Sequence, residues 1–482
     1  MVFQNIIKMK NIKIIIIAFL LICPVLSNAQ NKDVVELTLE TCRNMAKENS
    51  EQVKIADENI SKANGEKKAA QSAWLPNISL KGTGMYTNTQ INQELTLPTK
   101  VFDMSTGELV PNIAVNPLTG EPIIGPDGNP VFNTYAYMPL DITLQGGFIA
   151  SLSAEQPIYA GGKIIAGNKM ADTGEKMAEE NRNLKTSEVL FDSDKSYYTY
   201  LSVKEKVVLA KKYQSLLAQL VKTVEDSYQT GMINQNELLK VKVQYNEASL
   251  QVQKAENGLE LARMSLCRVI GVDFNTQIEI NDSISRETES IDNMAASAKD
   301  RVEYQLLQSN VEMAKQNIKM VQGDYLPNAG VSLGYNYYSV LLQGMDNYSS
   351  HGFNAIASVK IPITSFGERK GKVKSAKADY NIKQYELQQA EEYLQLEIEQ
   401  ARLNLLDAQT RVEMTKTSQE QANENLRISR DNYNLGMETI VNLLEAQAEW
   451  QKAYSNKIDA LTDLKIKESN YLRVTNRFKS ND

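Results

Sequence analysis

The sequence is poor in the residues on which enzymes most often depend. His351 is the only histidine among 482 residues, which leaves little material for histidine-based acid–base catalysis or for a histidine-rich metal site. Lys and Arg number 52 against 59 Asp and Glu, so the formal net charge is −7 and the basic excess of nucleic-acid-binding proteins is absent. We therefore expect no enzyme, no cofactor, no metal site and no nucleic-acid partner.

Long apolar runs are equally scarce. The run 14–22 follows three lysines and precedes small residues at 27–29, which is the pattern of a secretory signal peptide, here 1–29. No later stretch supplies the roughly 18 apolar residues that a transmembrane helix needs. An exported chain of this kind that crosses a membrane must do so as a β-barrel, because in lipid only helices and closed barrels satisfy their backbone polar groups.

The three cysteines do not form a disulfide framework. Cys42 and Cys267 lie far apart in segments of helical character, and we expect them to be buried free thiols. Cys23 follows the apolar run of the signal and leaves lipid anchoring open as an alternative. The bulky Ile22 before it and Pro24 after it disfavour acylation.

What the sequence does contain is an internal duplication. A helical pattern opens at Thr38, a candidate N-cap, and ends at the Leu-Pro-Asn step 75–77, because proline forces the preceding residue out of the helical region. The same step recurs 251 residues later, at 326–328. Tyr, Gly, Met and Leu-Leu recur between 228–239 and 433–444 at an offset of 205 residues. The chain is therefore predicted to be two copies of one structural unit.

Each copy contains a long helical hairpin. Apolar residues at coiled-coil spacing predict long helices at about 163–229 and 367–432, packed along their length on neighbouring helices. Gly231 and Gly436 follow these helices, and we expect them to form the tip turns, because glycine reaches the left-handed angles of a helix end. The return helices are expected at about 236–268 and 438–476.

Each copy also contains a β-hairpin. Four segments alternate with a period of two, at 78–86, 148–155, 331–337 and 353–360, which predicts strands. Apolar residues on one face and polar residues on the other are typical of membrane barrels. A soluble hairpin with one solvent-exposed face gives the same alternation. The alternation alone therefore does not distinguish a membrane barrel from a soluble hairpin.

Two charged residues occupy equivalent places on the return strands. Glu155 and Lys360 both belong to the polar face, and we predict that they line a lumen where strands give way to helices. The alternative is a surface ion pair, which would contribute roughly 0–1 kcal/mol.

The first β-hairpin is longer than the second. The repeat offset falls from 251 to 205 residues inside the hairpins, so the first carries 46 extra residues within about 88–146. Proline leaves such a segment few ways to form regular structure, and we expect a long loop at the extracellular end. Seven of the chain's twelve prolines lie in it: Pro98, Pro111, Pro117, Pro122, Pro126, Pro130 and Pro139.

These patterns divide the chain into consecutive segments. The expected segments are a signal peptide 1–29, short helices of the first repeat 30–75, a first β-hairpin 76–160 with a long loop 88–146, a first helical hairpin 161–268 with its tip near 228–237, a connecting equatorial segment 269–297, a helix of the second repeat 298–325, a second β-hairpin 326–365, a second helical hairpin 366–476 with its tip near 433–445, and a tail 477–482.

Four strands are too few to close a barrel. The smallest membrane barrels have about 8 strands, and an open edge in lipid leaves backbone groups unsatisfied. The chain must therefore oligomerise if it spans a membrane. Two, three or four copies would each supply enough strands, and these arguments do not choose among them.

Over essentially the whole mature chain, the sequence resembles the TolC-like outer-membrane efflux protein family (outer membrane factors). The resemblance rests on the Leu-Thr-Leu-Glu opening at 37–40, the paired Leu-Pro-Asn steps, the paired strand hairpins and the paired Tyr-x-x-Gly tips. It implies an α+β membrane protein that forms a homotrimer. A 12-stranded transmembrane β-barrel, with four strands per chain, would be continued by a long antiparallel α-helical coiled-coil barrel.

The resemblance also implies a location and partners. The barrel would contact lipid of the outer membrane and the helical tunnel would lie in the periplasm. A periplasmic membrane-fusion adaptor and an inner-membrane pump of the RND or ABC type would dock at the helical tip.

Family members narrow their periplasmic entrance with polar residues just past the tip glycine. The matching positions are Asn236 and Glu237 in the first hairpin and Asn442 and Glu445 in the second. In a trimer the two glutamates would place six carboxylates around one axis, and such a ring repels its own charges and favours cations. The alternative for each residue is an ordinary solvated position at a helix start, where acids are favoured anyway.

Two further residues match the family's tip. Tyr433 corresponds to an aromatic residue that helps to hold the closed state. Glu438 stands where some relatives carry arginine, so the arginine-based latch of those relatives is in doubt here.

The predicted function is thus a passive exit duct for drugs or other small molecules, gated at the helical tip. The same duct can serve type I protein secretion, because the pump sets the cargo, and that alternative stays open. A different class of protein, a soluble periplasmic coiled-coil scaffold or adaptor, would leave the alternating strands unexplained. An enzyme is not expected, because no set of reactive residues converges in the sequence.

Overall fold

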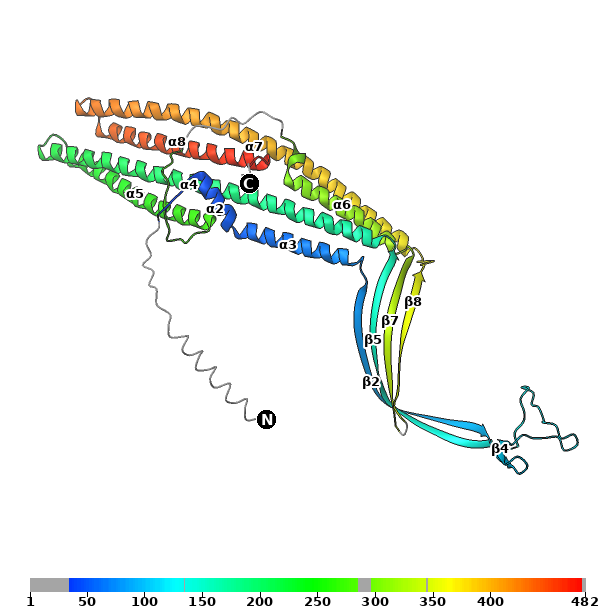
Figure 1. Ribbon diagram of the computed structural model, residues 1–482. Coiled ribbons are helices and arrows are strands. Elements are labelled where there is room, and N and C mark those ends of the chain that lie inside the picture. The colour runs from blue at the N-terminus through cyan, green and yellow to red at the C-terminus, as the bar shows by residue number, and fades with distance from the viewer. Residues whose placement is uncertain (1–33, 134, 285–295, 344–345, 479–482) are drawn as a thin grey trace, which may run out of the picture. The chain divides into compact units, whose positions relative to one another are not determined.

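The chain divides into two compact units, which are shown in Figure 1. The predicted signal peptide, with Cys23, lies outside the residues that the structure describes, as does most of the tail. The computed structural model describes residues 34–133, 135–284, 296–343 and 346–478. The helical unit comprises Met1–Ser61, Met177–Gln308 and Glu386–Asp482, and the sheet unit comprises Lys62–Lys176 and Ser309–Tyr385.

Two long helical hairpins dominate the described helices, as the coiled-coil spacing predicts. The longer helix of each hairpin has 67 residues and is therefore about 100 Å long at 1.5 Å per residue. The first hairpin consists of α4 (Lys163–Gln229) and α5 (Gln235–Ile270), and the second of α7 (Glu368–Asn434) and α8 (Ile440–Val474) (Figure 1).

One apolar core joins the two hairpins toward their tips. Leu217 of α4, Val241 of α5, Leu426 of α7 and Trp450 of α8 belong to the same buried cluster. The Trp450 indole Nε1 donates a hydrogen bond to Asn423 Oδ1 on α7 at 2.7 Å, so the polar end of this large side chain is satisfied where it is buried. The apolar positions therefore pack the hairpins on each other as well as within themselves.

The described part of the connection between the two repeats contains a strand that its composition does not predict. Strand β1 (Val34–Glu36) pairs in parallel with β6 (Gln277–Glu279), inside the segment 269–297 that we expected to be only a connection. The pair was not predicted because three-residue strands are too short for a recognisable alternation. The Lys204 amino group on α4 donates to the Ile280 carbonyl at 2.6 Å and fastens the described end of this segment to α4.

Thr38 is the N-cap of the first helix, as predicted. Its side chain accepts a hydrogen bond from the Thr41 backbone N–H, and Thr41 completes a capping box. The helical stretch is divided at Ser50 into α2 (Leu39–Asn49) and α3 (Glu51–Ser72). Cys42 and Cys267 are both buried and free, which confirms the expectation for these two thiols.

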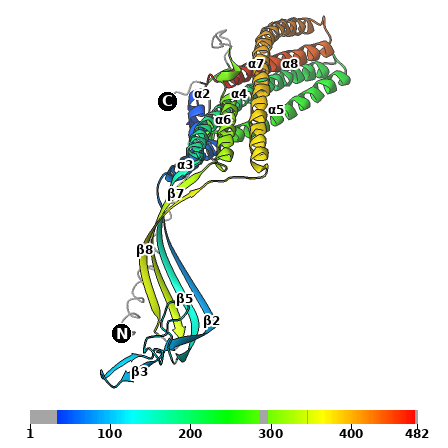
Figure 2. The same cartoon turned by 90° about the vertical axis from the view of Figure 1, so that its right-hand side faces the viewer.

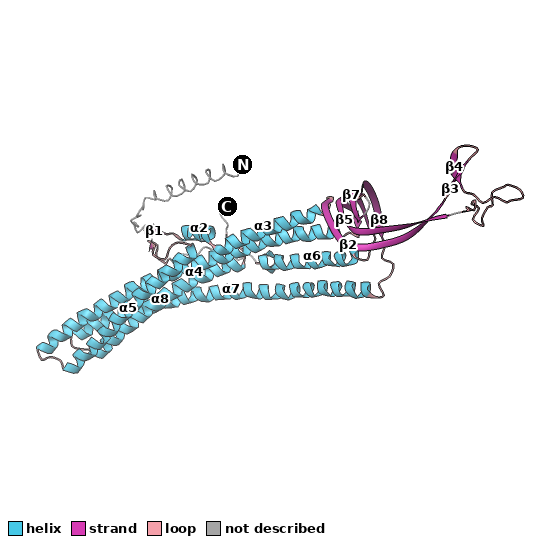
Figure 3. Ribbon diagram, turned by 90° about the horizontal axis from the view of Figure 1, so that it is seen from below, coloured by secondary structure: helices cyan, strands magenta, loops and turns pink. Residues whose placement is uncertain are grey.

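The main sheet has four antiparallel strands. Their order is β2-β5-β7-β8, so the two β-hairpins join through β5 and β7 (Figures 2 and 3). Helix α3 precedes the first hairpin and α6 (Val302–Gly323) precedes the second, which repeats the order helix, hairpin, long helix as the duplication predicts. The strands are β2 (Asn77–Pro98), β5 (Tyr135–Ala160), β7 (Asn328–Gln343) and β8 (Tyr348–Lys360).

The expectation of a loop throughout 88–146 is wrong. The β2–β5 ladder continues past a bulge at Tyr86 and reaches the pair Pro98 with Tyr135. Proline is tolerated at strand ends and where its missing N–H has no ladder partner. Pro98 ends β2, and at Pro139 the strand β5 pairs only with β2, because β7 begins its pairing at Thr143. These two prolines therefore lie where the ladder tolerates them, and the other five lie at 111–130, between the β2–β5 strands.

A close approach of two backbones joins the sheet to its helices. A Cβ on Gly161, whose φ is +62°, would lie 2.3 Å from the carbonyl oxygen of Gly323. Gly161→Ala is therefore expected to lower the free energy of unfolding by about 2–4 kcal/mol, from backbone strain and a clash. The measurement is the urea midpoint of the detergent-solubilised protein, followed by circular dichroism.

The matched control is the neighbouring glycine. Gly162 also has a positive φ, +80°, but no atom lies within 4 Å of a Cβ added there. Gly162→Ala should thus cost only about 1 kcal/mol, the strain of the left-handed conformation alone. Equal losses at the two positions would show that the close approach to Gly323 contributes nothing.

Candidate functional site: hairpin tips and a two-faced sheet

Both hairpin tips turn on a left-handed glycine. Gly231 has φ 77° and Gly436 has φ 74°. In each tip the glycine N–H returns to the carbonyl three residues earlier, and the following methionine N–H returns to the carbonyl five residues earlier. This is the Schellman pattern, which satisfies the last carbonyls of a helix. The predicted tip turns therefore have the expected geometry in both repeats.

The residues past the glycines are held by matched caps. Asn234 accepts from the Glu237 N–H at 3.0 Å, and Thr439 accepts from the Asn442 N–H at 3.3 Å. Glu237 and Asn442 thus occupy the same helical position in the two repeats. The partly exposed Glu237 carboxylate lies in the first turn of α5, where the helix dipole favours a negative charge.

The structure brings the two tips together at Tyr433. Its ring is half-buried against the core cluster that joins the hairpins. Burial, and then the negative charge of Glu237, raises the pKa of the Tyr433 phenol. Ile233 of the first tip packs against the same cluster, whereas Asn236, Asn442 and Glu445 are exposed to solvent.

Glu438 is placed differently from the other predicted gate residues. It precedes the cap of α8, and the Ser429 hydroxyl lies 3.2 Å from its Oε1. The side chain is partly buried within its own hairpin. Its hydrogen bond with Ser429 links the turn before α8 to the last part of α7.

The main sheet has one apolar and one polar face. Register places Leu80, Leu152, Tyr335 and Phe353 side by side across all four strands, and these side chains are 78%, 50%, 49% and 70% exposed. A large exposed apolar surface of this kind marks a contact with lipid or protein. The alternation predicted from the sequence is thus present in three dimensions.

The next row across the sheet is small and polar. It contains Ser79, Ser153, Gly334 and Asn354. The hydroxyls of Ser79 and Ser153 lie 3.0 Å apart. The serine and asparagine side chains of this row can form hydrogen bonds with each other or with water. A sheet with one solvent-exposed face requires this of the residues on that face.

Glu155 and Lys360 lie on this polar face, as predicted. Glu155 pairs with Ser332 of β7 and Lys360 pairs with Asn328, near the ends of the strands that continue into α4 and α7. Because their cross-strand partners stand four residues apart on β7, the two charges do not oppose each other. The register therefore does not support the alternative of an ion pair between these two residues within one chain.

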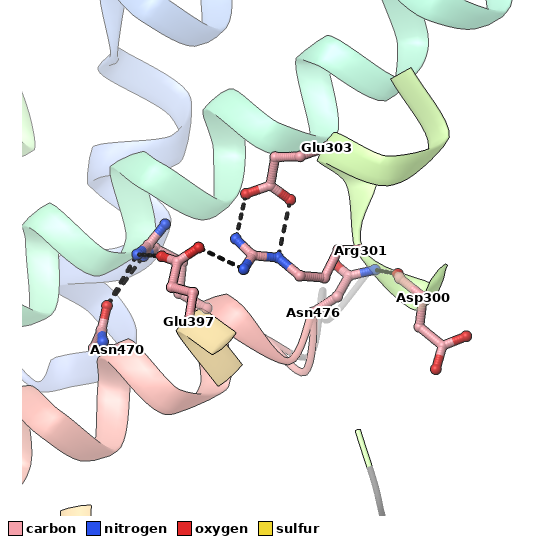
Figure 4. A network of polar contacts seen from close by, with 7 residues as sticks. Asp300, Arg301, Glu303, Glu397, Asn470 and Asn476 are labelled. Carbon is pink, nitrogen blue, oxygen red and sulfur yellow. Dashed lines mark hydrogen bonds and ion pairs between the residues drawn. The ribbon is translucent and has the colours of Figure 1, made fainter. Parts of the chain in front are cut away.

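A buried arginine fastens the second repeat, and sequence reasoning did not find it. Arg301, which is 2% exposed, precedes α6 and forms ion pairs of 2.6 Å with Glu303 and with Glu397 of α7 (Figure 4). Burial acts to lower the pKa of Arg301, but its hydrogen bonds to the two glutamates outweigh burial and raise it. Arg473 of α8 forms an ion pair of 3.3 Å with the same Glu397. This glutamate of α7 therefore binds both α8 and the residue that precedes α6.

A second buried network fastens the first repeat to α8. Asp194 on α4 is fully buried and accepts two hydrogen bonds of 2.6 Å from Arg43 on α2. The Ser469 hydroxyl on α8 donates to the same carboxylate at 2.6 Å. Asp194 shares a buried helical face with Leu190 and Tyr197. The only feature of the sequence that could have indicated a buried ion pair is therefore a charged residue within an apolar helical face.

The described residues offer little for metal chemistry or helical membrane crossing. Within them, no group of histidine, cysteine, aspartate or glutamate side chains is suited to a metal ion. None of the helices that the structure describes is long and apolar enough to cross a lipid bilayer.

Comparison with known proteins supports the family resemblance. Residues 304–476 match the family model described as outer membrane efflux protein. This match agrees with the resemblance stated from the sequence, over residues that include the second helical hairpin and its tip glycine, Gly436. No curated protein matches the chain significantly.

The fold resembles those of solved outer-membrane channels. The MtrE outer membrane channel of Neisseria gonorrhoeae, in its open state, aligns with a TM-score of 0.69 at 15% identity, over 92% of this chain and 89% of that chain. The outer membrane protein VceC of Vibrio cholerae aligns with 0.67 at 14%, over 91% and 95%. The CmeC outer membrane channel of Campylobacter jejuni aligns with 0.67 at 14%, over 92% and 87%. At such identities the likeness establishes the α+β fold.

Proposed function

We propose that three copies of this chain form a passive duct across the outer membrane, through which drugs or other small molecules leave the periplasm. The observation that carries the proposal is the two-faced sheet. Its exposed apolar face suits lipid, and its polar face would line a water-filled bore. The helical hairpins would extend the bore into the periplasm, where a membrane-fusion adaptor and an inner-membrane pump of the RND or ABC type deliver the cargo.

The edges of the sheet support closure by neighbouring copies. Strands β2 and β8 are the two outer strands and each has one neighbour within the chain. An unpaired edge cannot persist in lipid. Pairing β8 of one copy with β2 of the next removes every edge, and three copies give a barrel of 12 strands.

The helices support lateral association as well. Leu239, Val243 and Leu250 lie exposed on α5, and Leu396 and Leu403 lie exposed on α7. Their spacings of four and seven residues put each set on one side of its helix. Exposed apolar stripes on long helices are typical of surfaces that pack on other helices, here those of the adjacent protomers.

The hairpin tips are the proposed gate. Three copies would place Glu237 and Glu445 in a ring of six carboxylates at the periplasmic entrance, with Asn236 and Asn442 between them. Tyr433, packed against the apolar cluster that both hairpins share, would hold the two hairpins of each protomer together in the closed arrangement. Such a ring attracts cations and repels anions.

The gate has a direct electrical test. Glu237→Ala combined with Glu445→Ala is expected to reduce the cation-over-anion permeability ratio by about half or more, because the ring charge is lost. The control removes the same number of exposed carboxylates away from the tips, through Glu247→Ala with Glu420→Ala. Unchanged selectivity in the tip variant, or an equal change in the control, would rule out the ring.

The duct itself is tested on purified mature protein. Its oligomer mass in detergent and its single-channel conductance in a planar bilayer are measured on one sample. A trimer that inserts and conducts in discrete steps supports the duct. A monomer or dimer that stays soluble without detergent would overturn the proposal and favour a periplasmic scaffold.

A further inference from the structure

The first β-hairpin carries a folded extension that has no counterpart in the second. Beyond Thr143, where β7 ceases to pair with β5, the β2–β5 ladder continues for eight further pairs to Pro98 and Tyr135. At about 3.3 Å per residue this arm is roughly 26 Å long. It carries residues 99–133, which we call the head.

The head has an ordered backbone. It begins with the hairpin of β3 (Lys100–Asp103) and β4 (Glu108–Pro111). Three short segments follow, and their centres form a closed ring of hydrogen bonds. Ala114 N–H donates to Val131 O at 2.7 Å, Val131 N–H to Ile123 O at 2.8 Å, and Ile123 N–H to Ala114 O at 2.8 Å.

This ordered backbone encloses no core. None of the residues 99–133 is buried, and none of them is a cysteine. Chains below about 40 residues usually need a disulfide, a metal or oligomerisation to be stable. Large apolar side chains of the head face solvent instead, and those of Phe102, Met104, Leu109 and Leu118 are 61% to 95% exposed.

The occupant that fits this surface is another copy of the same head. In the proposed trimer the arms continue β2, the strand that would meet the neighbouring protomer, so three heads leave the same rim of the barrel. Tethering makes their contact effectively intramolecular, which multiplies a weak affinity. Phe102 and Leu109 are cross-strand partners and form one continuous apolar site for such a contact.

Charge opposes this contact only weakly. The head carries four carboxylates and one lysine, at Lys100, Asp103, Glu108, Glu121 and Asp127. Asp103 and Asp127 already accept hydrogen bonds from Ser105 and Asn129 in their own turns. Repulsion between exposed charges is screened over about 8 Å at physiological ionic strength, so apolar burial can outweigh it.

We propose that the three heads pack against one another outside the membrane and form a cap that narrows the outer mouth of the duct. The inference rests on the proposed trimeric duct. It adds a second constriction, at the outer mouth, to the one proposed at the hairpin tips. It also explains why an apolar, disulfide-free segment is ordered without a core of its own.

Cross-linking in the full-length protein tests the contact. Leu118→Cys is introduced and treated with a short bis-maleimide, while Cys42 and Cys267 are left in place because both are buried. A covalent dimer within the trimer is expected. Adding Phe102→Ser, Met104→Ser and Leu109→Ser should lower the cross-linked fraction by at least about tenfold, because the apolar contact is lost. Ser349→Cys, exposed in the shorter hairpin, is the control and should not cross-link.

Conductance of a second variant gives an independent readout. The quadruple serine variant at Phe102, Met104, Leu109 and Leu118 is expected to conduct at least about twice as well as the unmodified trimer, because the cap opens. If the Leu118→Cys trimer does not cross-link and the quadruple serine variant conducts as the unmodified trimer does, the cap is ruled out and the proposed duct is unaffected. A sample whose mass is not trimeric would overturn both.

Discussion

Lysine in place of Leu152 is expected to keep the protein out of the membrane, whereas lysine in place of Ser153 is not. Leu152 lies on the apolar face between Leu80 and Tyr335. Tyr335 stands midway along β7, so this row would lie near the centre of the bilayer. Lysine on the lipid face there costs about 2–4 kcal/mol per chain, and roughly 6–12 kcal/mol per trimer.

The adjacent residue provides a control on the same strand. Ser153 points to the opposite face, beside Ser79 and Gly334, where a water-filled bore would accept a charge. The measurement is the yield of outer-membrane trimer that migrates differently when heated, compared with total exported protein. The Leu152→Lys variant should lose most of this trimer, and the Ser153→Lys variant should keep it.

Two other results would argue against the assignment of the faces. Equal loss in both variants would indicate that the sheet is buried on both sides, as in a protein scaffold. Loss confined to Ser153→Lys would indicate that the faces are reversed. The comparison depends on a one-residue shift along one strand, so differences in expression or export affect both variants alike.

The elements predicted correctly are those that depend on local chemistry. Gly231 and Gly436 were identifiable because a left-handed helix end requires glycine in most contexts. Thr38 was identifiable because a capping side chain acts on residues a few positions away. The strand faces followed from alternation over seven to nine residues, and the duplication provided a second, independent copy of each pattern.

The elements that were missed depend on distant partners. The β1–β6 pair joins Val35 to Ile278, and neither three-residue strand has a pattern of its own. The arm of the first hairpin was mistaken for loop because prolines are normally excluded from strands. At Pro139 that exclusion does not apply, since only β2 pairs with β5 there.

The candidate site was predictable in part for the same reason. Repetition located the tips, but it could not reveal that the Ser429 hydroxyl donates to Glu438 or that Tyr433 packs against the cluster shared by both hairpins. Those contacts depend on how two hairpins pack. The buried charges were the hardest to foresee, because a single charged residue in an apolar stripe does not disclose its partner.

Asp194→Ala is expected to lower the free energy of unfolding of the helical unit by about 3–5 kcal/mol. The fully buried carboxylate accepts two hydrogen bonds from the guanidinium of Arg43 and one from the hydroxyl of Ser469. Removing it takes away the carboxylate through which Arg43 of α2 and Ser469 of α8 are hydrogen-bonded to α4. The measurement is urea unfolding in detergent, followed by the helical circular dichroism signal.

Three further variants separate charge from packing. Asp192→Ala removes an exposed carboxylate two residues away and should change stability by less than about 0.5 kcal/mol. Asp194→Leu combined with Arg43→Met removes both charges and should recover part of the loss, because a well-packed apolar pair avoids the cost of burying ions. Asp194→Asn keeps one acceptor for Ser469 and should fall between. A loss under about 1 kcal/mol in Asp194→Ala would mean that the three helices are held together by apolar packing, and that the ion pair of Asp194 with Arg43 adds little to their stability.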